Sequence, residues 1–265
     1  MRRLLPLARD TIQAFRELSL VTYASAIAFR ALVALIPLTL LGLGLLGPLG
    51  LEGVWRDSLA PPIRERVTPE VFRAIDSSVE RILREGGAGL IALASGLALW
   101  HLTMAMRVAT VALNKIHREG ESRPFLLRIA TSVGLALATA ICLFGSVLVV
   151  VGAPRVSAGS LELLLATLRW AVAVALLGLA VALVVRYAPS EQPQPRWASA
   201  GSALITGTWV VASLAFRWYV SSVADFTTAV GSLTVFLVLT AYVFTTSAIF
   251  LIGTQLDEVL RERRA

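Results

Sequence analysis

The sequence predicts an all-α integral membrane protein with six transmembrane helices and a long loop between the first and second of them. Hydrophobic residues make up 57% of the 265 residues and charged residues only 15%, whereas a soluble globular chain has about 25% charged residues. A helix needs about 20 mostly apolar residues to cross the hydrocarbon. Such runs recur six times, at 24–47, 88–110, 126–152, 163–185, 199–220 and 230–253. A single membrane domain, 1–265, accounts for the whole length.

The N-terminal residues do not predict a cleaved signal peptide. The apolar stretch after Arg2 and Arg3 ends at Arg9 and Asp10, which makes it too short for the apolar core of a signal sequence. We therefore expect the first span to act as its own insertion signal.

The lysines and arginines are divided unevenly between the connecting segments. If both ends of the chain are cytoplasmic, the inner segments carry eleven Lys and Arg and the outer segments seven, six of them in the loop 48–87. The positive-inside rule therefore favours a multi-pass inner-membrane protein with both termini in the cytoplasm. The net charge of +7 then indicates anionic lipids as partners. No nucleic acid is expected, because no basic stripe alternates with aromatic residues.

The outer loop 48–87 contains a predicted helix of its own. Thr68 can cap it, Pro69 suits the first helical position, and Gly86-Gly87 can end it. Its apolar residues fall on one face: Val71, Phe72, Ile75, Val79, Ile82 and Leu83. This helix is interpreted as lying on the bilayer surface or over the mouth of the bundle. Packing against the ends of the spans is the alternative.

The six spans hold no Asp or Glu, so arginines within them need an explanation. The four that we consider here are Arg30, Arg107, Arg169 and Arg217. Each lies within about two turns of a span end, so its side chain can reach the headgroup region by snorkelling. Taken one at a time, snorkelling is the simpler interpretation of each.

Two spans carry polar stripes that end in such an arginine. At about 100° per residue, each stripe falls within a narrow arc. The second span and its extension carry Thr103, Arg107, Thr110 and Asn114, and the fifth span carries Ser202, Thr206, Ser213 and Arg217. A stripe of this kind is unfavourable against lipid and is expected to face the bundle interior or a water-filled cavity. The alternative is that these groups only form hydrogen bonds between helices.

If the stripes line a cavity, its charge is positive and it has no internal counter-ion. Arginine binds phosphate and carboxylate groups with two parallel hydrogen bonds, so an anionic headgroup or solute is the expected ligand. The candidate substrate-binding residues are Arg30, Arg107, Thr103, Thr110, Asn114, Arg217 and Ser213. Asp225 could instead pair with Arg217 and remove it from this set.

The sequence gives little indication of a metal, nucleotide or catalytic site. Pro37 cannot donate a backbone hydrogen bond and is expected to kink the first span. His101 and His117 have no second ligand at metal spacing, so neither a metal nor a cofactor is expected. The literal G-x-G-x-x-G at Gly42 to Gly47 continues an apolar helix and favours close helix packing over nucleotide binding. No nucleophile–base arrangement is readable, so we do not expect an enzyme.

Four stretches of the sequence resemble the YihY/BrkB family of bacterial inner-membrane proteins, historically labelled ribonuclease BN. They are "YASAIAFRALVALIPLTLLGLGLLG" at 23–47, "ALNKIHREGESRPF" at 112–125, "WYVSSVADFTTAVGSL" at 218–233 and "LIGTQLDEVL" at 251–260. Val230 stands where the family often has Tyr, and "GTQL" replaces the usual "GAEL". The residues that the resemblance marks are Arg30, Pro37, Asn114, Arg123, Pro124, Gly231 and Ser232.

The resemblance implies six spans with cytoplasmic termini and no settled biochemical activity; some members have been linked to serum resistance or to export of lipid precursors. Together with the polar stripes, it leads to the hypothesis of a transporter or lipid translocator for an anionic, phosphate-bearing amphiphile or solute. A non-transporting envelope scaffold is the alternative, and an RNA-cleaving enzyme comes third. The sequence leaves open whether the chain forms a homo-oligomer.

Overall fold

The computed structural model describes residues 4–85, 88–152, 159–190, 200–222 and 229–263, and within these ranges the chain is helical with no strand. The predicted all-α class is therefore confirmed. Nine α-helices and one π-helix (η1) follow one another in these ranges: α1 (Leu4–Glu17), α2 (Leu20–Leu46), η1 (Val54–Leu59), α3 (Ala60–Arg64), α4 (Pro69–Glu85), α5 (Ala88–Ile116), α6 (Phe125–Gly152), α7 (Gly159–Tyr187), α8 (Ala200–Ser222) and α9 (Ala229–Glu262).

Five of the described helices are long and apolar enough to cross a membrane: α2, α5, α6, α7 and α9. The chain is therefore a multi-pass membrane protein. The 23-residue α8 occupies the predicted fifth span but is not among these five, so the count of six spans stays a prediction.

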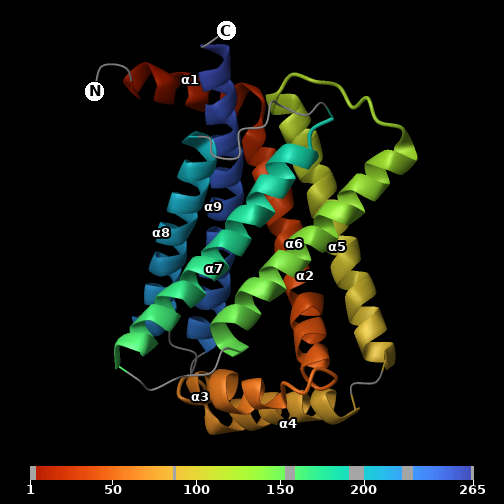
Figure 1. Ribbon diagram of the computed structural model, residues 1–265, viewed down its shortest axis with the longest axis vertical. Coiled ribbons are helices and arrows are strands. Elements are labelled where there is room, and N and C mark those ends of the chain that lie inside the picture. The colour runs from red at the N-terminus through yellow and green to blue at the C-terminus, as the bar shows by residue number, and fades with distance from the viewer. Residues whose placement is uncertain (1–3, 86–87, 153–158, 191–199, 223–228, 264–265) are drawn as a thin grey trace.

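The long helices form one bundle (Figure 1). α2 packs along α5 and α9, α8 packs along α9, and α6 and α7 form a pair that runs obliquely beside them. α1 and the C-terminal end of α9 lie at one end of the bundle, while α3 and α4 lie at the other. The pocket described below lies at the first of these ends, where α5 finishes and α6 begins.

The N-terminal helix α1 was not expected from the sequence. It packs against α9 and α2, and Asp10 on α1 forms an ion pair with Arg263 just beyond α9. Ser19, with a φ of 54°, makes the sharp turn between α1 and α2. α1 thus lies across the end of the bundle instead of extending the first span.

The predicted loop helix is confirmed as α4, which begins at Pro69 and ends at Glu85. Its apolar face packs inward: Val79 forms a cluster with Trp55 and Ala60, and the Trp55 indole Nε1 donates to Asp76 Oδ1 at 2.9 Å. α4 therefore packs against η1, α3 and the end of α2, which favours the alternative interpretation over a helix lying free on the bilayer.

The structure also shows where Pro37 and the "GTQL" stretch lie in the helix packing. α2 continues through Pro37, which is buried within it. Gly253 of the "GTQL" stretch lies where α9 meets α8: a Cβ atom there would come within 2.3 Å of Ile205 Cγ1, and one at Gly201 would come within 2.1 Å of the Gly253 carbonyl oxygen. Only glycine at these positions lets the two helices approach so closely.

Candidate functional site: a basic pocket between α5 and α6

A pocket of 310 Å³ opens where the last turns of α5 face the first turns of α6, with the connecting segment 117–124 above them. Polar side chains from all three parts line it. The lining residues are Arg107, Thr110, Val111, Asn114, Lys115, Glu119, Glu121, Arg128 and Ser132.

The polar stripe predicted on the second span faces the protein interior. Thr103, Thr110 and Asn114 are 8%, 3% and 5% exposed, and Arg107 between them is half-buried. Because the spacings of four, three and four residues return to one helix face, this stripe places three of its members, Arg107, Thr110 and Asn114, in the pocket wall. Thr103 lies deeper along α5 and does not line the pocket.

Three cationic side chains meet in the pocket, and none of them pairs with a carboxylate among the described residues. Arg107 Nη1 lies 3.9 Å from Met104 Sδ. The Lys115 ammonium lies 5.4 Å from the ring centroid of Tyr23, and the Arg128 guanidinium lies 5.6 Å from that of Phe125. Contacts with sulfur and aromatic faces leave most of the N–H donors of these groups unused. The pocket therefore concentrates positive charge that is still able to bind an anion.

The expectation of a cavity without an internal counter-ion is wrong, because Glu119 and Glu121 also line the pocket. These two residues belong to the connecting segment between α5 and α6, whereas the expectation concerned only residues within the spans. The Glu119 backbone N–H donates to the Asn114 carbonyl at 2.9 Å, and Arg118 takes the left-handed conformation with a φ of 57°. This turn folds the segment back onto the end of α5 and brings both carboxylates to the pocket rim.

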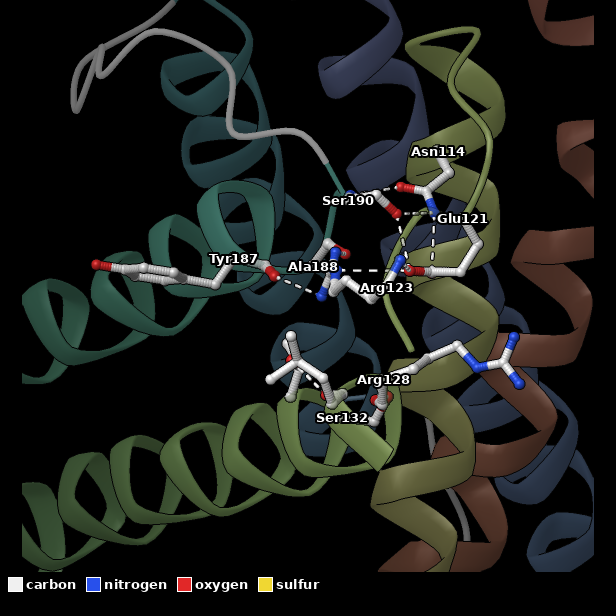
Figure 2. A network of polar contacts seen from close by, with 10 residues as sticks. Asn114, Glu121, Arg123, Arg128, Ser132, Tyr187, Ala188 and Ser190 are labelled. Carbon is white, nitrogen blue, oxygen red and sulfur yellow. Dashed lines mark hydrogen bonds and ion pairs between the residues drawn. The ribbon is translucent and has the colours of Figure 1, made fainter. Parts of the chain in front are cut away.

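Glu121 is occupied by a hydrogen-bonded clamp with Asn114 and Ser190 (Figure 2). Asn114 Nδ2 donates to Glu121 Oε2 at 3.2 Å and to Ser190 Oγ at 3.0 Å. The Ser190 backbone N–H donates to Asn114 Oδ1 at 2.9 Å, and its hydroxyl donates to Glu121 Oε1 at 2.9 Å. Both amide hydrogens of Asn114 are thus used within the protein, so in this arrangement Asn114 holds the pocket wall in place.

Arg123 extends the same clamp to the end of α7. Its guanidinium donates to the carbonyl oxygens of Tyr187 at 3.4 Å and of Ala188 at 2.5 Å, and its Nε lies 3.5 Å from Glu121 Oε1. A cation at a helix C-terminus satisfies the last carbonyls and interacts favourably with the helix dipole. Asn114 and Arg123, two residues that the family resemblance marks, therefore join the end of α5 and the connecting segment to the end of α7.

Arg128 points away from this clamp. Figure 2 shows its side chain extending from the start of α6 across α5, while its backbone carbonyl accepts from the Ser132 hydroxyl at 2.9 Å. Arg128, the third residue of the predicted third span, was not among the arginines expected to form a site. Lys115 was counted only as a loop charge. A helical-wheel comparison of both span ends could have found the two.

The other predicted site residues lie outside the pocket. Arg30 on α2 is half-buried, and Arg217 on α8 is exposed on the bundle surface. Ser213 is also exposed, and its hydroxyl lies 2.8 Å from the hydroxyl of Tyr242 on α9. The α8 stripe thus includes one contact between helices, as the alternative interpretation expected. The side chains of Ser202 and Ser232 and all of Asp225 lie outside the described residues.

One buried contact between polar side chains links the segment 117–124 to α9. His117 Nε2 lies 3.8 Å from Glu258 Oε2, and both side chains are more than nine-tenths buried. His117 Nδ1 lies 2.7 Å from the Leu113 carbonyl oxygen, and Arg261 donates to Glu258 at 2.6 Å. The end of α9 is thereby fixed to the end of α5, beside the pocket.

Known proteins are similar to this chain over most of its length. The family model described as "Virulence factor BrkB" matches residues 11–265. The ribonuclease-like protein YfkH of Bacillus subtilis is 22% identical over 250 residues, covering 91% of this chain and 90% of YfkH. The UPF0761 membrane protein Mpe_A1422 of Methylibium petroleiphilum is 26% identical over 260 residues, covering 94% of this chain but 58% of that longer protein. No solved structure matches.

Proposed function

The chain belongs to the BrkB family of membrane proteins, and from that premise we propose that it is a transporter or lipid translocator that binds an anionic, phosphate-bearing amphiphile or solute between α5 and α6. The observation that carries the proposal is the group of three cations, Arg107, Lys115 and Arg128, in one pocket without a carboxylate partner among the described residues. Arginine side chains present paired N–H donors that match the oxygens of phosphate.

The surroundings of the pocket support an anion over a neutral ligand. The pocket is lined by three cations and two carboxylates, Glu119 and Glu121. Glu121 accepts hydrogen bonds from Asn114 and Ser190 and pairs with Arg123, a cation outside this group, so the pocket keeps an excess of positive charge. In a site partly shielded from water, the attraction between cations and an anionic ligand is stronger than in bulk water. We also propose an inner-membrane location with cytoplasmic termini, which would put the pocket at the cytoplasmic leaflet.

A scaffold without transport activity is the second candidate. The clamp of Asn114, Ser190 and Arg123 favours it, because it shows that part of the polar stripe holds helices together. None of the hydrogen bonds and ion pairs of the clamp among the described residues involves the three cations, however. The name ribonuclease-like belongs to YfkH, and we propose no RNA cleavage for this chain.

Binding measured on the purified protein in nanodiscs would test the proposal. We expect phosphatidic acid to bind more tightly than phosphatidylcholine, and Arg107→Ala and Arg128→Ala each to weaken phosphatidic acid binding about tenfold or more, as the loss of a charge-assisted hydrogen bond predicts. Arg217→Ala is the matched control, because it removes the same charge from the exposed surface of α8. Equal losses from all three variants would contradict a site in this pocket.

A further inference from the structure

A buried threonine hydroxyl deeper than the pocket lacks a hydrogen-bond partner. Thr103 on α5 is 8% exposed, and its Oγ1 is buried and has no partner in the structure. The Oγ1 of Thr110 in the pocket is in the same state. A helical threonine commonly donates to the carbonyl one turn back, as Thr39 and Thr131 do here at 2.8 Å. A buried hydroxyl that makes no such bond is unfavourable by itself and marks a place where a ligand can bind.

A second hydroxyl on the facing helix repeats this arrangement. Thr139 Oγ1 on α6 is also buried without a partner. Thr139 follows Ser132 by seven residues, as Thr103 precedes Thr110 by seven. Seven residues are close to two full turns, so each deep threonine lies on the same helix face as the pocket residue above it, about 10 Å further along the helix.

The two deep threonines lie on helices that pack against each other. α5 and α6 run in opposite directions, and Leu102, next to Thr103, packs with Ala136 of α6 in a buried cluster. The direction from the pocket to Thr103 along α5 is therefore the same as the direction from the pocket to Thr139 along α6. Both hydroxyls lie on the membrane-interior side of the pocket.

The pocket also has an apolar rim. Val111 lines the pocket and is 51% exposed. In the first turn of α6, just before Arg128, three large apolar side chains lie on the surface of the bundle: Phe125, Leu126 and Leu127. In a membrane protein such exposed apolar side chains face lipid tails, so the basic groups lie beside a surface suited to acyl chains.

We propose that the ligand is an ester-linked phospholipid with an exposed phosphate, such as a phosphatidic acid, and not a free phosphate compound. Its phosphate binds Arg107 and Arg128, and its ester oxygens accept hydrogen bonds from Thr103 and Thr139. This order matches a bilayer, in which ester linkages lie deeper than phosphates. This proposal rests on the proposed function for the binding of a phosphate group, and it adds the ester linkage of the ligand.

Two phosphate-bearing probes separate the linkage from the phosphate. Phosphatidic acid has ester oxygens, whereas hexadecyl phosphate carries a phosphate on a plain alkyl chain. For the Thr103→Val, Thr139→Val double variant we expect binding of phosphatidic acid to weaken about three- to tenfold for each hydrogen bond lost, with hexadecyl phosphate binding unchanged. Thr131→Val is the control, because the Thr131 hydroxyl already bonds to its own helix.

The outcomes are distinct. If the double variant binds phosphatidic acid as wild type does, or loses both probes equally, the assignment of the linkage is overturned. If the wild type binds neither probe, the proposed function falls as well. If Arg107→Ala loses both probes while the threonine variant loses only phosphatidic acid, both proposals are supported. Binding of glycerol 3-phosphate as tight as that of phosphatidic acid would replace the lipid with a soluble phosphate.

Discussion

Asn114 Nδ2 donates to Ser190 Oγ at 3.0 Å, and so joins two residues that are 76 positions apart in the chain. The pair connects the end of α5 to the segment after α7, and Glu121 completes the triangle from the loop between α5 and α6. The basic pocket is thus held in shape by polar contacts that do not involve its cations. Structure and binding can therefore be separated by mutation.

Replacing Asn114 should affect stability first. Asn114→Ala leaves the Ser190 backbone N–H without its acceptor and Glu121 with one donor fewer, and a buried group that loses its partner costs about 1–3 kcal/mol. We expect a lower Tm in detergent. Ser213→Ala, which removes an exposed hydroxyl on α8, should leave the Tm close to wild type. An unchanged Tm for Asn114→Ala would show that the clamp contributes little.

Lysine substitutions test how the arginines act. If Arg107 holds a phosphate with its planar fork, Arg107→Lys should retain part of the activity and Arg107→Ala almost none, because lysine keeps the charge but not the paired donors. If Arg107 only snorkels, lysine should replace it fully. The measurement is lipid transfer per folded molecule in vesicles. Arg30→Ala, outside the pocket, should have a weaker effect; full activity in both alanine variants would leave the scaffold function ahead.

The close approach of α8 and α9 should not tolerate a larger residue. A Cβ at Gly253 would come within 2.3 Å of Ile205 Cγ1, so Gly253→Ala should destabilise the protein by about 1–3 kcal/mol, as overpacking does. Gly207→Ala on α8 is the matched control, since a Cβ there meets nothing within 4 Å. Thermal unfolding of the two variants side by side would show whether the Gly253 contact is as tight as the structure has it.

Labelling of single cysteines would test the orientation. Cys142 is buried, so it should react slowly with a membrane-impermeant maleimide. We expect Ser77→Cys on α4 to be labelled from outside the inner membrane and Gln13→Cys on α1 only after the membrane is opened, because the positive-inside rule favours cytoplasmic termini. The reverse pattern would invert the topology and place the pocket at the outer leaflet.

Purified protein should show no RNA hydrolysis, with or without divalent metal ions. The pocket groups are suited to binding an anion, and we assign none of them as a nucleophile or general base. RNA cleavage that follows the protein through purification and disappears with Arg107→Ala would contradict this prediction and favour a catalytic role for the pocket.

The helices could be predicted from the sequence because they depend on local patterns. The loop helix at Pro69 was predicted from its cap and its apolar face, and it is present as α4. The stripe from Thr103 to Asn114 was predicted to face inward because a charged stripe is unfavourable against lipid, and its threonines and Asn114 are buried. Both arguments use only spacing along one helix.

The tertiary structure decided which stripes belong together. The α8 stripe has the same local pattern as the α5 stripe, yet Arg217 is exposed and lies outside the pocket. Arg128 and Glu121, which belong to neither stripe, line it instead. Periodicity defines the face of a helix on which a residue lies, but not the helix that this face meets. That depends on how the connecting segments fold and on close contacts such as the one at Gly253, which link residues far apart in the chain.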